Sequence, residues 1–224
     1  AIEKARLLEK TRKEVKQREK AEKNVKENYG KLQKTMQGTI FTLAKIVEMK
    51  DPYTAGHQRH VAQLSEIIAK EMKFSKNRIE TLKTAALLHD IGKINIPSEI
   101  LTKPTKLLPI EFSLIKEHPL NGYEMLKNIE FPGPVKEIAL QHHERMDGSG
   151  YPNGLKGNEI MLEARILAVA DVVEAMSSHR PYRSALGIDK ALEEIEKNKG
   201  ILYDSKVVDI CVRLFKEKRF KFKE

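Results

Sequence analysis

The side chains best suited to chemistry lie in the segment His89-Asp90-Ile91-Gly92-Lys93, which follows an apolar helical run over residues 82–88. A neutral imidazole such as that of His89 binds metal ions, and the carboxylate of Asp90 can bridge two cations. Gly92 suits the left-handed position that closes a helix, and the partial negative charge at a helix C-terminus favours cations. Because a single His-Asp pair is common on helix surfaces, its meaning depends on the other donors in the chain.

The chain supplies these donors. Four further histidines lie at predicted helix ends or in short polar breaks: His57, His118, His142 and His143. Asp171 lies in the apolar run 166–173, where an unpaired buried carboxylate is costly and a metal ion is the simplest partner. Five histidines and two aspartates are too many ligands for one tetrahedral zinc ion. They fit two six-coordinate ions with Asp90 as the bridge, and such a pair indicates hydrolysis of a phosphate ester.

Charged and aromatic residues near these donors fit the same chemistry. Lys93, one turn from Asp90, can hold a phosphate oxygen or help to protonate a leaving alkoxide, so we expect both residues to be catalytic. Arg180 and Arg183 can clamp a second phosphate. Tyr151, in a glycine-rich loop directly after two histidines, can stack on a base or bond to a phosphate.

Helices must position these side chains, because the sequence has no long run of alternating apolar and polar residues. The spacing predicts helices over residues 1–50, about 54–72, 75–88, 109–118, about 119–129, 135–143, 162–177, 189–198 and 205–218, an ordered proline-rich loop over 94–109 and an irregular segment over 144–159. The first helix carries a heptad pattern that is good from Val25 onward. It predicts a signalling coiled coil in a parallel dimer, and the alternative is a charged, solvated single helix.

Composition excludes several classes of protein. The net charge is +9, but residues 1–34 hold twelve basic and six acidic side chains and residues 213–224 hold six and two, which leaves −1 for the rest. The central part therefore lacks the basic surface that grips a nucleic-acid polymer. The single cysteine, Cys211, cannot form an internal disulfide and lies at an apolar helical position. No apolar run is long enough to span a membrane, so we expect a cytoplasmic protein or the cytoplasmic part of a larger sensor.

Several motifs together resemble the HD-GYP family, the branch of the HD phosphohydrolases that degrades cyclic di-GMP. The resemblance covers about residues 40–218. Its motifs are Asp-Pro-Tyr-Thr-Ala-Gly-His ending at His57, His89 to Lys93, Lys116-Glu117-His118-Pro119, His142-His143-Glu144, Gly150-Tyr151-Pro152, Ala168-Val169-Ala170-Asp171 and Arg180-Pro181-Tyr182-Arg183. The resemblance implies an all-α HD-superfamily helical bundle over residues 41–224, preceded over residues 1–40 by a coiled-coil-like helix from an upstream sensor domain.

The resemblance also implies a ligand set and a reaction. Two ions, iron or manganese, would be bound. One would be held by His57, His89, Asp90 and Asp171, and the other by Asp90, His118, His142 and His143. Lys93, Tyr151, Arg180 and Arg183 would contact the substrate. The implied reaction is linearisation of cyclic di-GMP to pGpG, in some members followed by cleavage to GMP. The implied partners are a second copy of the chain, joined through the N-terminal helix, and a diguanylate cyclase domain docking on Gly150-Tyr151-Pro152.

Some positions depart from the family pattern or leave roles open. Members that bind three metal ions have glutamate where this chain has Tyr53, so we expect two ions. His60 and His179 are interpreted as histidines behind the ligands or on the surface, and the alternative is a direct catalytic role. Glu144 is either a buried acid behind the ligands or a solvent-facing residue. Two other functions stay open: a catalytically silent cyclic di-GMP receptor, and an HD hydrolase of another cyclic dinucleotide or nucleotide.

Overall fold

The computed structural model describes residues 2–50, 56–178 and 187–222, all of them in helices, turns and loops without a strand. The first helix, α1, runs over Ile2–Lys50 as the absence of proline predicts. The chain divides into two compact units, residues 1–41 and 42–224, so the last turns of α1 belong to the second unit. Among the described helices none is long and apolar enough to cross a membrane.

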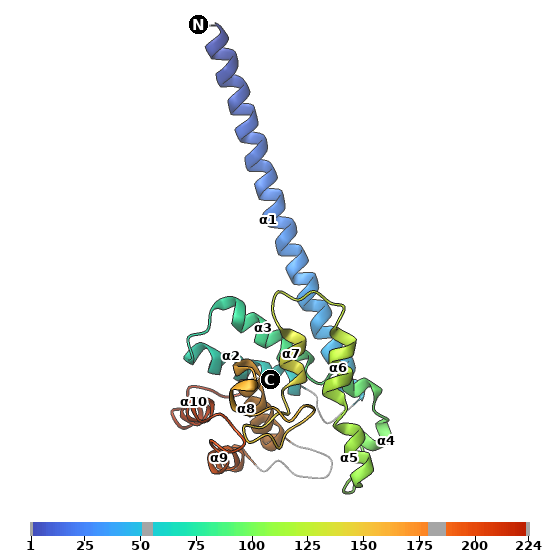
Figure 1. Ribbon diagram of the computed structural model, residues 1–224. Coiled ribbons are helices and arrows are strands. Elements are labelled where there is room, and N and C mark those ends of the chain that lie inside the picture. Colours follow the sequence, from blue (N-terminus) through green and yellow to red (C-terminus); the bar gives the residue numbers. More distant parts are fainter. Residues whose placement is uncertain (1, 51–55, 179–186, 223–224) are drawn as a thin grey trace. The chain divides into compact units, whose positions relative to one another are not determined.

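The second unit is a helical bundle, which confirms the predicted all-α fold (Figure 1). Its further elements are α2 (His57–Glu71), α3 (Lys76–Leu88), the 3-10 turn η2 (Ile91–Asn95), α4 (Ser98–Leu101), α5 (Pro109–Ile115), α6 (His118–Leu126), α7 (Val135–Leu140), the 3-10 turn η3 (Gly157–Glu159), α8 (Leu162–Ser177), α9 (Ile188–Lys197) and α10 (Ser205–Lys216).

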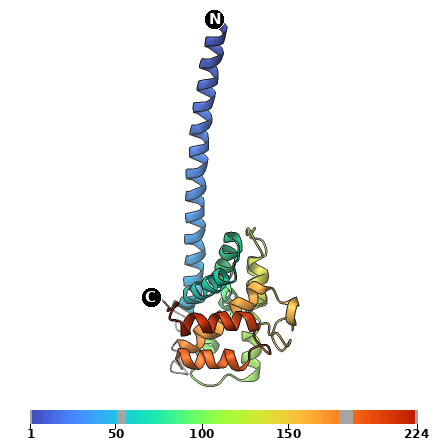
Figure 2. The ribbon, with the colours of Figure 1, turned by 90° about the vertical axis from the view of Figure 1, so that its left-hand side faces the viewer.

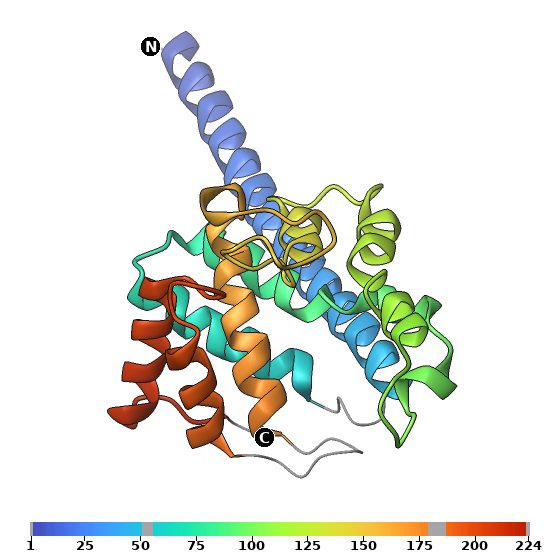
Figure 3. The ribbon, with the colours of Figure 1, turned by 60° about the horizontal axis from the view of Figure 1, so that its bottom comes forward.

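Helix α8 lies at the centre of the bundle. It contacts α2, α3, α7, α9 and α10 (Figure 3). Its apolar residues on every face explain this position, since Ile166, Leu167, Val169 and Val173 are all fully buried. Helices α9 and α10 pack side by side and bury one apolar face each (Figure 2). Cys211 lies in this core, as its apolar spacing predicts.

Three predicted boundaries differ from the structure. His118 begins α6 and does not end the preceding helix, because α5 stops at Ile115. Helix α7 stops at Leu140, so the two histidines that follow lie in a turn. The proline-rich stretch contains η2 and the short helix α4. Thr54, the predicted N-cap of α2, lies outside the described residues, and Gly56, in the left-handed conformation, takes the cap position.

The last turn of α1 is fixed to the bundle at two points. Val47 is buried. The Glu48 carboxylate accepts a hydrogen bond of 3.0 Å from the backbone N–H of Gly56, directly before α2. The Lys50 ammonium donates a hydrogen bond to the backbone carbonyl of Ile94 in η2. This turn therefore contacts both the segment directly before His57 and the segment directly after Lys93.

Candidate metal centre

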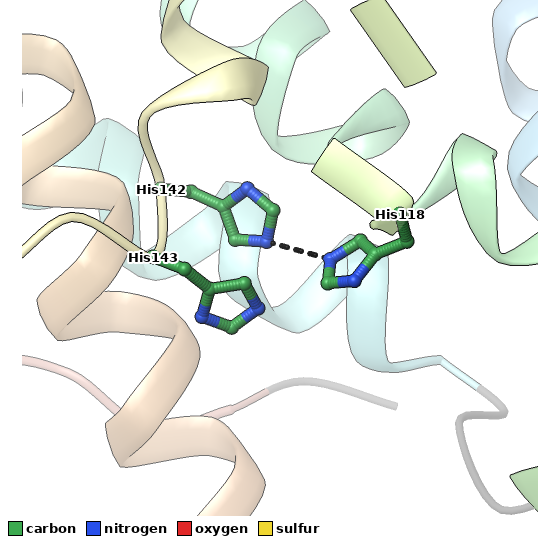
Figure 4. Close-up of side chains that lie close together, drawn as sticks. All are labelled: His118, His142 and His143. Atoms are coloured by element: carbon green, nitrogen blue, oxygen red, sulfur yellow. Dashed lines mark hydrogen bonds between the residues drawn. The ribbon is translucent and has the colours of Figure 1, made fainter. Parts of the chain in front are cut away.

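The seven predicted ligands come together at the middle of the bundle. Three groups of donor atoms, each within 4.8 Å of one another, share this cluster. They are His57, His89 and Asp171; His118, His142 and His143; and His89, Asp90 and His142. Figure 4 shows the second group, in which the Nε2 atoms of His118 and His142 lie 3.2 Å apart.

Asp90 lies between the first two groups. Its Oδ2 atom is 3.4 Å from His89 Nε2 and 4.0 Å from His57 Nε2. Its Oδ1 atom is 3.4 Å from His118 Nε2. Because each carboxylate oxygen faces a different group, the side chain has the geometry of a bridging ligand.

Ends of helices supply most of these side chains. His89 caps α3, His57 and His118 begin α2 and α6, and the other two histidines follow α7. Only Asp171 comes from the middle of a helix, and its side chain is 13% exposed. Helix ends have free backbone groups and open space, so several of them can meet at one point without burying unpaired backbone.

Gly92 has a different role from the one we expected. It is not in the left-handed conformation, so the prediction that it closes a helix in that way is wrong. A Cβ atom at this position would clash with the backbone carbonyl of His118 and the N–H of Gly122 in α6. Glycine is required because the backbone of η2 lies directly against α6, which brings His118 close to Asp90.

Burial makes most of the histidines poor proton acceptors. It lowers the pKa of His118 to about 4, and it lowers the pKa of His142 and His143 well below the ordinary value. Positive charge on the neighbouring histidines His143, His89 and His118 would lower the pKa of His142 further. These imidazoles are therefore neutral near pH 7, which is the form that binds metal ions.

His57 and the carboxylates show the opposite electrostatics. Burial by itself lowers the pKa of His57, but hydrogen bonds to Asp171 and Glu174 outweigh it and raise the pKa to about 9. Burial by itself raises the pKa of Asp90, but the charges of His89 and Lys93 hold it well below its usual range. Asp171 is likewise held ionised by His57. Two buried carboxylates are thus negative in a site rich in nitrogen donors.

This donor set fits divalent metal ions. The Nε2 atom of His89 is buried and has no hydrogen-bond partner among the described residues. A buried imidazole nitrogen without a partner costs free energy unless something binds it. Neutral imidazoles combined with two carboxylates are typical ligands of iron, manganese and zinc, and the absence of cysteine from the cluster disfavours a structural zinc site.

The segment after the histidine pair forms one wall of the cluster. The ring of Tyr151 stacks on that of His143 with 4.7 Å between centroids. Burial raises the pKa of Tyr151, so its phenol keeps its proton. The loop folds back closely on the chain, since a Cβ atom on Gly150 would clash with the backbone of residues 143–145.

Glu144 holds this loop in place. Its carboxylate is 2% exposed and accepts hydrogen bonds from the backbone N–H groups of Asn153 at 2.7 Å and Leu155 at 3.0 Å. The residue is therefore a buried anchor, and the solvent-facing alternative is wrong.

Lys93 lies where the sequence places it, beside Asp90. Its ammonium group is 2.7 Å from Asp90 Oδ2, and its side chain is 15% exposed. Arg180 and Arg183, the two other predicted substrate contacts, lie outside the described residues, as do Tyr53 and His179.

One important residue was not foreseen from the sequence. Glu174 contacts both His57 and His60. Its spacing could have indicated this role, because Glu174 lies three residues after Asp171 and therefore shares a face of α8 with it.

Fold and site together define an all-α protein with a buried histidine–aspartate centre. A family model described as HD domain matches residues 42–207. The chain is 42% identical over 177 residues to the cyclic di-GMP phosphodiesterase response regulator RpfG of Xanthomonas campestris, covering 78% of this chain and 47% of that protein. It is 41% identical over 198 residues to a cyclic di-GMP phosphodiesterase of Thermotoga maritima, covering 88% and 54%.

A solved structure is also similar. The crystal structure of a cyclic GMP-AMP specific phosphodiesterase of Vibrio cholerae matches with a TM-score of 0.51 and 34% identity, covering 79% of this chain and 40% of that one. This chain thus spans about half the length, or less, of these relatives. The chain belongs to the HD domain family, and the resemblance to its HD-GYP branch is confirmed.

Proposed function

We propose that the chain is a metal-dependent phosphodiesterase that hydrolyses a cyclic dinucleotide, and that its substrate is cyclic di-GMP, opened to linear pGpG. The observation that carries this proposal is the position of Asp90 between two groups of histidine and aspartate donors. Relatives named as cyclic dinucleotide phosphodiesterases support the substrate class.

We propose two divalent ions, iron or manganese, in the predicted arrangement. His57, His89 and Asp171 hold one, and His118, His142 and His143 hold the other, with Asp90 shared between them. Such ions supply a bound water of lowered pKa and neutralise charge on the phosphoryl oxygens.

The other residues bind and orient the substrate. The Lys93 ammonium lies at the edge of the centre, where it can donate to a phosphate oxygen and then to the 3′ oxygen as the phosphorus–oxygen bond breaks. Tyr151 keeps its phenol proton as a donor and offers its ring to a guanine base. Arg180 and Arg183 are proposed to hold the second phosphate.

A second candidate substrate is favoured by one comparison. The Vibrio cholerae structure belongs to an enzyme described as specific for cyclic GMP-AMP, and this chain is 34% identical to it. A catalytically silent receptor has less support, because the seven residues proposed as ligands form groups whose donor atoms lie within 4.8 Å of one another.

The proposal extends to partners and location. We propose a homodimer, which the apolar seam of α1 supports, and docking of a diguanylate cyclase domain on the Gly-Tyr-Pro loop, which rests on the family resemblance alone. The proposed location is the cytoplasm, or the cytoplasmic part of a larger sensor.

The test is anaerobic purification with metal analysis, followed by incubation with cyclic di-GMP and cyclic GMP-AMP in parallel and chromatography of the products. We expect about two equivalents of iron or manganese, and pGpG as the main product. If two ions are bound and only cyclic GMP-AMP is cleaved, cyclic GMP-AMP is the substrate. If cyclic di-GMP is bound but not cleaved, the proposed enzymatic activity is contradicted and the receptor is favoured.

A further inference from the structure

Three ligand histidines are oriented in the same way. The Nδ1 atoms of His89, His118 and His142 lie 2.8, 2.7 and 2.5 Å from the backbone carbonyl three residues earlier in each case. Each Nδ1–H therefore donates to a carbonyl at or near the end of a helix, where carbonyls lack partners within the helix. This bond fixes the tautomer and turns Nε2 toward the cluster.

His57 is oriented by a carboxylate. It is the first residue of α2, with Gly56 at the cap position. The carbonyl of Gly56, its neighbour, already accepts the backbone N–H of His60. Its Nδ1 atom instead bonds to the Oε2 atom of Glu174, while its Nε2 atom lies 3.1 Å from Asp171 Oδ1.

Glu174 is itself firmly held. Its side chain is 2% exposed, and its Oε1 atom accepts a hydrogen bond of 2.7 Å from the Ser178 hydroxyl. His60 Nδ1 lies 3.2 Å from the same oxygen. Since Glu174 lies one turn after Asp171 on α8, a single helix face offers one ligand carboxylate and the carboxylate that orients another ligand.

We propose that Glu174 is a positioning residue that fixes His57 for metal binding and strengthens it as a donor, so that it sets the affinity of the ion held by His57, His89 and Asp171. A carboxylate that accepts the second N–H of a ligating imidazole makes the metal-binding nitrogen more basic than a backbone carbonyl does. The inference rests on the proposed metal centre and is independent of the substrate.

The test is titration of the metal-free full chain with Mn²⁺, followed by calorimetry and by electron paramagnetic resonance to count bound ions. Glu174→Ala should keep one ion at wild-type affinity and bind the other about 10–100-fold more weakly. Glu174→Gln keeps an acceptor of nearly the same shape without the charge, so it should fold like the wild type and lose less affinity. At limiting Mn²⁺ the Glu174→Gln variant should hydrolyse cyclic di-GMP more slowly than the wild type, and excess Mn²⁺ should restore the rate.

Glu163→Gln is the matched control. Glu163 lies on the same helix, is 8% exposed, and pairs with Arg78 at 2.8 Å, away from the ligands. Its replacement should leave both affinities unchanged. Two ions bound at wild-type affinity by both Glu174 variants would overturn the role of Glu174 while the metal centre stands. Failure of the wild-type chain to bind Mn²⁺ would overturn the metal centre itself, and this proposal with it.

Discussion

At the scale of single residues, the cluster combines histidines whose pKa values move in opposite directions. Burial lowers the pKa of His118 to about 4, whereas carboxylate partners overcome burial and raise the pKa of His57 to about 9. In the metal-free protein the proton on His57 therefore takes the place of a cation between Asp171 and Glu174.

These shifts predict how the stability of the metal-free protein depends on pH. The stability contributed by the His57 proton is complete below the unfolded pKa of 6.5 and is lost as the pH rises toward 9. His118 destabilises the folded protein as the pH falls from 6.5 to about 4, because in this range only the unfolded chain binds a proton at His118. We expect the melting temperature in the presence of a chelator to be highest near neutral pH and to fall on both sides. His57→Gln should remove the alkaline decline, and an unchanged decline would contradict this assignment.

Asp90 is the residue on which the proposed dinuclear arrangement depends most. Asp90→Asn removes the negative charge that faces both groups of histidines, so we expect weaker binding of both ions. The loss of hydrolysis should exceed the ~10–100-fold typical of residues that only support a ligand. Metal analysis and turnover measure this, with Asp147→Asn, an exposed acid in the neighbouring loop, as control. Full activity with Asn at position 90 would exclude a bridging carboxylate.

At the scale of elements, the loop after the histidine pair is held by its own buried carboxylate. Glu144→Ala removes the acceptor of two backbone N–H groups, each worth about 0.5–1.5 kcal/mol. Tyr151 should then leave its stacked position, which raises KM for the dinucleotide while two ions remain bound. Glu159→Ala is the control, because it also removes a carboxylate that accepts a backbone N–H, that of Lys156, from the same loop. Equal effects of the two variants on KM would show that Glu144 has no special relation to the substrate.

Candidate ligands are easier to recognise in the sequence than the residues that support them. His118 and Asp171 are visible in the sequence because a histidine near a proline and an acid in an apolar helix both stand out. The bond between His57 and Glu174 joins positions 117 residues apart, and only the packing of α2 on α8 creates it. The role of Gly92 is hidden for the same reason, since it depends on the approach of α6.

At the scale of the whole molecule, the all-α bundle follows from helical spacing, which is clearest in α9 and α10, where one apolar face is buried. The apolar seam of residues 1–41 is a further prediction from the same spacing. Val25 and Leu32 occupy core heptad positions and are 68% and 67% exposed in the single chain. Such a row of apolar side chains is expected to be covered by a second helix.

Substitution of this seam tests the proposed dimer. We expect Val25→Asp combined with Leu32→Asp to convert a dimer into a monomer, because buried carboxylates would face each other across the seam. Light scattering coupled to size-exclusion chromatography measures the mass. Asn24→Asp, on the outer face of the same helix, should remain dimeric. A monomeric wild-type chain would favour the solvated single helix.

The final turn of α1 also restricts how the metal centre can move. Glu48 bonds to the backbone one residue before His57, and Lys50 bonds to the backbone one residue after Lys93. A rotation of this turn would therefore displace both segments together. It would change the spacing between His57 and Asp90, so a torque carried along the helix would be converted into a change in the distance between the two proposed metal ions.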